Sequence, residues 1–207
     1  MVSIRWALLA FALTIAPAAM LKAALTQPGD VQQQDYLTGQ LLVASPEMGD
    51  PRFAHSVILL VRHDRNGAFG LIVNRPAREE ELARLLQDLG QDSDGVSGKI
   101  EIYLGGPVET RVGFVLHSVD YQRPETVAID GKVALTTSAA VLRDIAQKRG
   151  PQKYIFAFGY AGWGAGQLED EMQRLAWFTA PDDPKLLFDD DRAKLWQDAI
   201  SRRSRAL

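Results

Sequence analysis

The chain has 207 residues, of which 46% are hydrophobic and 24% are charged, and its formal net charge is −3. These values are typical of one globular domain with a buried core and argue against intrinsic disorder. Nucleic-acid binding needs a basic surface, so the acidic balance predicts no direct nucleic-acid partner. The chain has no cysteine, which excludes disulfides, thiol catalysis and zinc sites built on cysteine.

The first 24 residues form an apolar segment led by a positive charge. Arg5 precedes an apolar run from Trp6 to Leu21, interrupted by Pro17, and such a run is shorter than a membrane-spanning helix requires. Its small residues at 16–18 resemble a signal-peptide cleavage site. Three interpretations stay open: a cleaved signal, an anchor that contacts a membrane through residues 6–21, or a start codon assigned too early, with Met20 as the true start. The predicted organisation is residues 1–24 as this segment, 25–35 as a polar linker and 36–207 as the domain.

The first half of the domain reads as three strands and a helix. Apolar runs predict strands at 37–45, 55–62 and 68–74, and Asn66-Gly67 predicts a hairpin between the last two, because both residues tolerate positive φ. The continuous run in 55–62 is typical of a strand buried on both faces. Leucines spaced along one helical face predict a helix over 79–89, ended by Gly90.

The second half alternates hairpin groups with helices. Strands are predicted at 100–104 and 113–117 around Gly105-Gly106-Pro107, and at 127–129 and 132–135 around Asp130-Gly131. Further predicted elements are a helix from Ser138 to Lys148, a strand at 154–160, and helices at 167–177 and 192–202. Grouped hairpins with helices between them favour an α+β fold of a single domain over a doubly wound parallel sheet.

Familiar catalytic patterns are not found in this sequence. There is no Gly-x-Ser-x-Gly elbow, and His55 and His117 are each followed by a serine that would point to the opposite face of its strand. His55 and His63 are too far apart along one strand to share a metal ion. The sequence predicts no cofactor and no metal, although a triad assembled across strands, for example with Asp50, stays open.

Three loops carry the candidate site. Residues 45–53, 105–108 and 159–167 are rich in glycine and turn formers, and the last of them precedes a predicted helix, where backbone amides can bind an anion. The acids that follow would repel phosphate there. Arg52 either clamps a carboxylate, Asp50 or Glu109, or faces a substrate. Our hypothesis is that the three loops meet in one groove that binds a ligand or partner, and the candidate residues are Asp50, Arg52, Trp163, Gln167 and Glu169. The alternative is that each loop only turns the chain.

Several long motifs, in order, resemble those of the bacterial YqgE/AlgH family. The motifs are Leu37 to Pro46, Asp50 to Val57, Gly70 to Pro76, Gly105 to Val108, Gly113 to Ser118 and Gly159 to Glu169. The resemblance implies an α+β fold whose bent, branching mixed sheet forms a pseudo-barrel flanked by helices. It implies no established enzyme activity.

The resemblance also carries expectations about function and location. The AlgH name is associated with regulation of transcription, and without a helix-turn-helix or a basic face such a role would be indirect. The favoured hypothesis is a non-catalytic binding or regulatory protein with an unknown protein or small-molecule partner. The alternative is an enzyme with an unrecognised active site in the glycine-rich loop groove. Family members are expected in the cytoplasm, whereas residues 1–21 offer export or membrane anchoring as the alternative.

Overall fold

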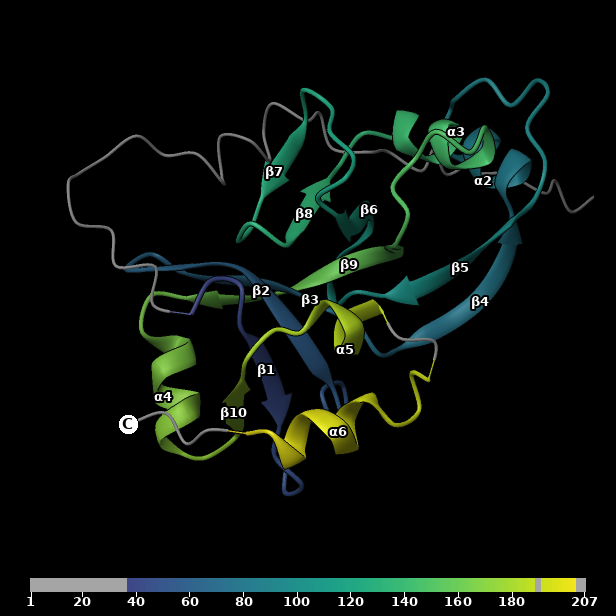
Figure 1. The fold of residues 1–207 in the computed structure, drawn as a ribbon. Coiled ribbons are helices and arrows are strands. Elements are labelled where there is room, and N and C mark those ends of the chain that lie inside the picture. Colours follow the sequence, from purple (N-terminus) through teal and green to yellow (C-terminus); the bar gives the residue numbers. More distant parts are fainter. Residues whose placement is uncertain (1–36, 189–190, 204–207) are drawn as a thin grey trace, which may run out of the picture.

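The computed structural model describes residues 37–188 and 191–203, and within them it shows a curled sheet of ten strands (Figure 1). The predicted segment 1–24 and linker 25–35 lie outside the described residues. The strands are β1 (Leu41–Ala44), β2 (Val57–Asp64), β3 (Gly67–Ile72), β4 (Pro76–Glu81), β5 (Lys99–Leu104), β6 (Val108–Ser118), β7 (Thr126–Ala128), β8 (Val133–Thr136), β9 (Tyr154–Gly164) and β10 (Trp177–Ala180).

The sheet branches at β9, a central strand of 11 residues. One half of β9 pairs with β3, from Ala161 to Gly164, and the other half pairs with β6 on one side and β5 on the other. The β5–β9 pair is parallel, whereas the others are antiparallel. The main path runs β10-β1-β2-β3-β9-β6-β8-β7, with β4 attached to β5. The predicted fold class, α+β with a bent and branching mixed sheet, is confirmed.

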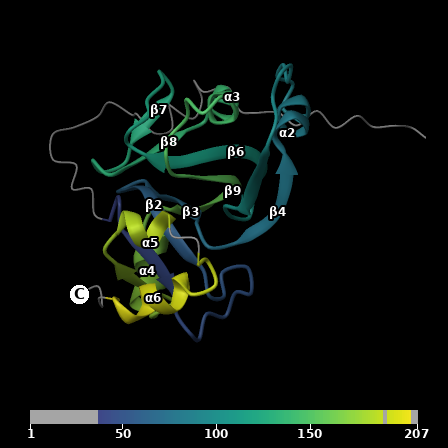
Figure 2. The ribbon, with the colours of Figure 1, turned by 45° about the vertical axis from the view of Figure 1, so that its right-hand side comes forward.

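Five short helices cover the two ends of the sheet in the described part of the chain. They are α2 (Leu82–Asp88), α3 (Ala140–Ala146), α4 (Gln167–Gln173), α5 (Pro184–Phe188) and α6 (Leu195–Ser201). Figures 1 and 2 both show α2 and α3 together at one end and α4, α5 and α6 together at the other. None of the described helices has the length and apolar character that would carry it across a bilayer.

The apolar run in β2 is buried on both faces, as its sequence predicts. Leu59 belongs to the cluster beneath α5 and α6, whereas its neighbours Ile58 and Leu60 belong to the cluster beside α4. Alternate residues of a strand point to opposite faces, so one unbroken apolar run supplies two cores. A third cluster joins α2 and α3 to β5, β6 and β9.

Both predicted hairpins are confirmed. Asp64 pairs with Gly67 around Asn66, and Ala128 pairs with Ala134 around Gly131, whose φ is +64°. The helix predicted over 79–89 is partly wrong, because residues 76–81 form β4 and the helix begins at Leu82. The leucine spacing that is typical of a helix begins only at Leu82. The three glutamates before it adopt an extended conformation and pair with β5.

The helix predicted over 167–177 is also too long. It ends at Gln173, Leu175 takes a left-handed φ of +59°, and residues from Trp177 onward pair with β1 as β10. The predicted glycine-rich loop 159–167 is mostly strand, since β9 continues to Gly164. The last helices are likewise shorter than predicted: α3 ends at Ala146 and α6 spans only Leu195–Ser201. At β10 and in the second half of β9, tertiary pairing outweighs local propensity.

Candidate functional site

Asp50 and Arg52 form an ion pair in the loop between β1 and β2. The distance from Arg52 Nη2 to Asp50 Oδ2 is 2.7 Å, and the Arg52 backbone N–H donates to Asp50 Oδ1 at 2.9 Å. The hydrogen bond from the Arg52 side chain lowers the pKa of Asp50. The carboxylate partner of Arg52 is therefore Asp50 rather than Glu109. Because 66% of the Arg52 side chain is exposed, this pair adds little to stability and leaves the guanidinium accessible.

The neighbouring Asn74 and Arg75 hold this loop in place. The Arg75 guanidinium donates to the carbonyls of Arg52 and Ala54. The Asn74 amide donates to the carbonyl of His55 at 2.8 Å. His55 has a left-handed φ of +57°, a strained conformation for a non-glycine residue that persists only when its surroundings enforce it. The loop is thus held by several side-chain hydrogen bonds and is largely exposed.

Trp163 and Gln167 belong to a cluster centred on Glu171, which the sequence did not single out. One oxygen of Glu171 accepts from the indole N–H of Trp163 at 2.9 Å and from that of Trp177 at 2.8 Å. Its other oxygen accepts from the Gln167 amide at 2.9 Å. Trp163 is only 7% exposed. The carboxylate of Glu171, on α4, therefore holds two buried indoles in place.

Glu169 points to a different partner, the imidazole of His63. His63 Nε2 lies 2.9 Å from Glu169 Oε1, and the ring is 2% exposed. The contact ties α4 to the end of β2. Glu169 is therefore a neighbour of the Glu171 cluster along the helix but is engaged separately from it.

The segment 159–167 contacts both of the other predicted loops, but at different residues along its length. The Phe53 ring packs edge-on against Trp177 with centroids 5.5 Å apart, and Trp177 packs edge-on against Trp163 at 5.9 Å. These rings connect the Arg52 loop to Trp163 on one side of the sheet. In contrast, Gly106 lies against the backbone of Tyr160, whose side chain packs on the cluster beneath α5 and α6. The single groove lined by all three loops stays a prediction.

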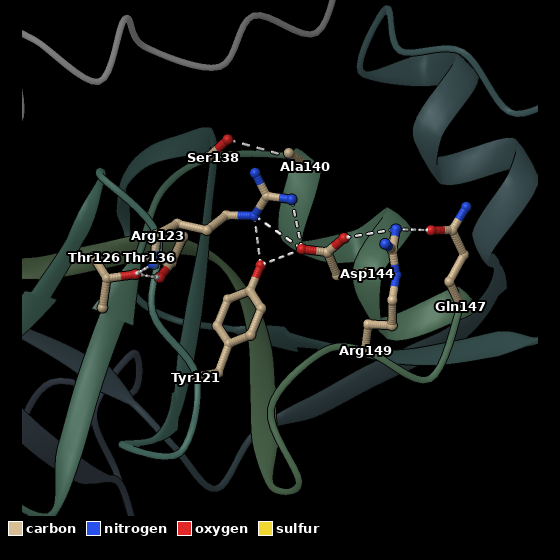
Figure 3. A network of polar contacts seen from close by, with 9 residues as sticks. All are labelled: Tyr121, Arg123, Thr126, Thr136, Ser138, Ala140, Asp144, Gln147 and Arg149. Atoms are coloured by element: carbon tan, nitrogen blue, oxygen red, sulfur yellow. Dashed lines mark hydrogen bonds and ion pairs between the residues drawn. The ribbon is translucent and has the colours of Figure 1, made fainter.

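A polar network between the β6–β7 connection and α3 is shown in Figure 3. The Arg123 guanidinium donates to Asp144 Oδ2 at 2.5 Å, and the Tyr121 hydroxyl donates to the same oxygen at 2.6 Å. Burial raises the pKa of Tyr121 to about 12, and its hydrogen bond to Asp144 adds to this. Burial alone would raise the pKa of Asp144, but the hydrogen bonds from Tyr121 and Arg123 lower it. At neutral pH both groups hold fixed protonation states, which suits a structural brace and not proton transfer.

His117 ends a hydrogen-bond chain whose direction is fixed. Its Nδ1 lies 2.8 Å from the carbonyl of Ser118, which only accepts, so Nδ1 carries the proton. Nε2 then accepts from the Thr136 hydroxyl at 2.8 Å, and Thr136 accepts from Thr126 at 2.7 Å. Thr126 in turn accepts the backbone N–H of Arg123 at 2.9 Å. The ring is fully buried, and burial lowers the pKa of His117, so the imidazole is neutral.

A cationic cleft of about 580 Å³ lies where β5, the start of β9 and α5 meet. Four cations line it: Lys99 from β5, Lys153 just before β9, Lys185 from α5, and Arg192 after α5. Glu101 is the carboxylate on the same wall, and the Tyr103 hydroxyl donates to it at 2.5 Å. We call this feature the cationic cleft.

Some cations of the cleft already have an ion-pair partner, and others do not. Lys99 Nζ lies 3.1 Å from Glu79, and this hydrogen bond raises the pKa of Lys99. Lys153 and Lys185 make no ion pair within residues 37–188 and 191–203. Arg192 Nη1 donates to the Leu187 carbonyl at 2.5 Å, while its buried Nε has no hydrogen-bond partner among the described residues. Among the described residues that line the cleft, Lys153 and Lys185 therefore present positive charge without an ion-pair partner, in a chain of net charge −3.

Sequence reasoning found neither Glu171 nor the cleft. Glu171 follows Trp163 by eight residues, and its role depends on Trp177 returning to the sheet in β10, which the longer predicted helix concealed. The cleft cations are isolated in sequence, at positions 99, 153, 185 and 192. Only the parallel β5–β9 pair and the return of α5 bring them together.

The comparisons with known proteins agree on one family. The AlgH-like family model matches residues 41–206. A UPF0301 protein of Novosphingobium aromaticivorans is 44% identical over 172 residues, covering 83% of this chain and 92% of that protein. A UPF0301 protein of Rhodospirillum rubrum is 45% identical over 158 residues, covering 76% and 82%.

Solved structures show the same likeness. The solution structure of the AlgH protein from Pseudomonas aeruginosa superimposes with a TM-score of 0.70 at 41% identity, covering 84% of this chain and 92% of that one. A crystal structure of a protein from Corynebacterium diphtheriae gives a TM-score of 0.65 at 20% identity, covering 84% and 91%. The similarity to the Corynebacterium diphtheriae protein is a similarity of fold alone.

Proposed function

The chain belongs to the AlgH-like family, and from this premise we propose that it is a non-catalytic binding protein whose ligand is a small polyanion held in the cationic cleft. Any effect on transcription is then indirect, through the ligand or a protein partner. The observation that carries the proposal is the cleft itself: its described lining residues include two lysines without an ion-pair partner, Lys153 and Lys185, and one carboxylate, Glu101, which Tyr103 already engages.

The groups around the cleft suit binding better than acid–base chemistry. Burial and the hydrogen bond to Glu101 raise the pKa of Tyr103 to about 12, and burial raises the pKa of Tyr154. Both phenols therefore stay protonated at neutral pH and act as hydrogen-bond donors. Two of the three histidines, His63 and His117, are buried away from solvent. These features favour recognition of an anion without turnover.

The test is calorimetric titration with inorganic tripolyphosphate at low salt, on the wild type and on Lys153→Ala, Lys185→Ala and the double variant. A hydrogen bond to a charged group contributes about 1.5 to 3 kcal/mol, so each substitution should weaken binding roughly tenfold or more. Arg65→Ala is the matched control, because Arg65 is an exposed cation in the β2–β3 turn, outside the residues that line the cleft.

Three outcomes would overturn the proposal. Tripolyphosphate could show no saturable binding, or Arg65→Ala could weaken binding as much as the cleft variants do. Release of inorganic phosphate during the titration would support the enzyme alternative instead.

The predicted site residues form a second proposed surface, for a protein partner. Arg52 is exposed and Asp50 partly exposed on a loop whose backbone accepts hydrogen bonds from Arg75, and Trp163, Gln167 and Glu169 anchor α4 beside it. Because the Asp50–Arg52 pair is exposed, Arg52→Ala should leave the melting temperature almost unchanged while removing the partner contact. A large fall in melting temperature would show instead that Arg52 is a structural clamp.

A further inference from the structure

Resting on the proposed function of the cationic cleft, we infer that its ligand is a phosphorylated polyol, whose phosphates contact Lys153 and Lys185 and one of whose hydroxyls donates to Glu101. The residues that line the cleft include this carboxylate as well as the cations. A ligand that fills the cleft therefore needs hydrogen-bond donors in addition to negative charge.

The residues of β5 that carry these charges lie on one face of the sheet. Ile100 and Ile102 belong to the cluster with α2 and α3, whereas Tyr103 belongs to the cluster beneath α5 and α6. Alternate residues of a strand point to opposite faces. Lys99 and Glu101 therefore share the face of Tyr103, which is the face that α5 covers.

The two lysines without an ion pair reach the same face from other segments. Tyr154 packs on the cluster with α2 and α3, and Ile155 packs on the cluster beneath α5 and α6. By the same alternation, Lys153 points toward α5. Its strand, β9, runs parallel to β5 and directly beside it, and Lys185 belongs to α5 itself. Lysines and carboxylate are thus available to one ligand.

Glu101 is the group that requires a donor on the ligand. Its Oε2 accepts from the Tyr103 hydroxyl at 2.5 Å, while its Oε1 has no hydrogen-bond or ion-pair partner among the described residues. A ligand with negative charge along its whole length would bring a phosphate against this carboxylate, and like charges repel. A hydroxyl instead donates to Oε1, and hydrogen bonds to charged groups are among the stronger ones.

The neighbouring cations favour a hydroxyl over an ammonium group as that donor. Lys99 lies two residues from Glu101 on the same strand face, and the Arg192 guanidinium lies 5.8 Å from the centre of the Tyr103 ring. Both cations would repel a ligand ammonium, whereas a hydroxyl can donate to Glu101 and accept from a lysine. Gln152 also lines the cleft, and its amide can donate to and accept from further hydroxyls.

The size of the cleft agrees with such a ligand. Its volume of about 580 Å³ lies within the roughly 300 to 1,000 Å³ of typical small-molecule sites. An inorganic phosphate would occupy only a small part of this space and would leave Glu101 without a donor. A sugar with two phosphates has the bulk to contact the lysines and the carboxylate at once.

The experiment compares fructose bisphosphate, with its phosphates on the two terminal carbons, with tripolyphosphate and with fructose. Each is titrated calorimetrically into the wild-type protein at one low salt concentration, without added divalent ions. Fructose bisphosphate should bind about tenfold more tightly than tripolyphosphate, because only the sugar phosphate supplies a hydroxyl to Glu101. Fructose alone should show no saturable binding.

Glu101→Gln is the variant that tests the hydroxyl contact. Its amide oxygen can still accept from Tyr103, but the negative charge is lost. The preference for fructose bisphosphate over tripolyphosphate should fall about tenfold, and tripolyphosphate itself should bind more tightly. Glu109→Gln is the matched control, because Glu109 is an exposed carboxylate outside the residues that line the cleft, and it should leave the preference unchanged.

The outcomes separate this inference from the proposed function. If tripolyphosphate binds the wild type as tightly as fructose bisphosphate, the polyol inference fails while the polyanion function stands. If neither binds, the polyanion function itself fails. A preference that Glu101→Gln leaves intact would also overturn the inference. The wild-type comparison decides the question even if the variant does not fold.

Discussion

His117 illustrates how burial fixes the state of a single residue. Since burial lowers its pKa, the folded state binds fewer protons than the unfolded state between the folded pKa and the ordinary value of 6.5. The free energy of unfolding should therefore be level above pH 6.5 and decrease as pH falls below it, by at most about 1.4 kcal/mol per pH unit. Denaturant unfolding between pH 5 and 8 measures this slope.

The control for His117 is His117→Gln, which should remove the additional slope below pH 6.5 although it lowers stability at every pH. NMR of the imidazole nitrogens should find the proton on Nδ1. A ring that titrates above 6.5, or a proton on Nε2, would contradict the hydrogen-bond chain through Thr136 and Thr126.

Glu171 is the residue whose loss should most affect the tryptophan cluster. Glu171→Ala leaves the indole N–H groups of Trp163 and Trp177 without their acceptor, and buried donors left unpaired are costly. We expect a loss of about 2 to 4 kcal/mol of stability and a change in tryptophan fluorescence. Gln173→Ala, an exposed position on the same helix, should do neither. Equal effects of the two substitutions would rule out the role given to Glu171.

Individual strands and turns were predictable where one local signal decides. The β2–β3 hairpin follows from Asn66-Gly67, and the double-sided burial of β2 follows from its unbroken apolar run. The sequence does not predict β4, because it ends in three glutamates. It does not predict β10 either, because Trp177 directly continues a helical pattern, although Trp177, Phe178 and Thr179 are residues that favour strands. Both become strands through pairing with β5 and β1, which are distant in sequence.

At Gly67 the β2–β3 hairpin lies directly against the backbone of β9. A Cβ at this position would lie 2.1 Å from the Trp163 carbonyl oxygen, and its φ is +126°. Gly67→Ala should therefore cost about 4 kcal/mol or more, because backbone and not a flexible side chain occupies the space. Chemical denaturation of the purified variant, or its failure to accumulate as folded protein, measures the effect.

Two other glycines serve as controls for the predicted effect of Gly67→Ala. Gly131 has a φ of +64° with open space around it, so Gly131→Ala should cost about 1 to 2 kcal/mol through backbone strain alone. Gly49 has neither constraint, and Gly49→Ala should be nearly neutral. A cost at Gly67 no greater than at Gly131 would refute the close approach.

At the scale of the whole molecule, the family motifs could be read from the sequence but the cationic cleft could not. The motifs are continuous, whereas the cleft combines Lys99, Lys153, Lys185 and Arg192 from four segments. Sequence could place Trp163 and Glu169 beside one helix, but not the partners that engage them, Glu171 and His63. Such partners are set by how α4 packs against β2, β9 and β10, which is a property of the complete fold.

The charge distribution and the short helices together argue against direct binding of DNA. The chain has a net charge of −3. Near its C-terminus Arg202 is paired with Asp183, and Arg203 lies over the ring of Phe178. No described helix exceeds seven residues, about 10 Å in length, whereas a recognition helix must reach several bases along the major groove. The lysines of the cleft are gathered in a hollow suited to one small molecule.

A gel-shift titration at two salt concentrations tests this prediction. Any complex seen at 50 mM salt should vanish by 150 mM, because a few lysine–phosphate contacts are lost as counterions compete. The Lys153→Ala and Lys185→Ala double variant should lose tripolyphosphate binding without changing the gel shift. A sequence-specific complex of nanomolar affinity at 150 mM salt would mean that the protein contacts DNA directly, and loss of that complex in the double variant would identify the cleft as the contact surface.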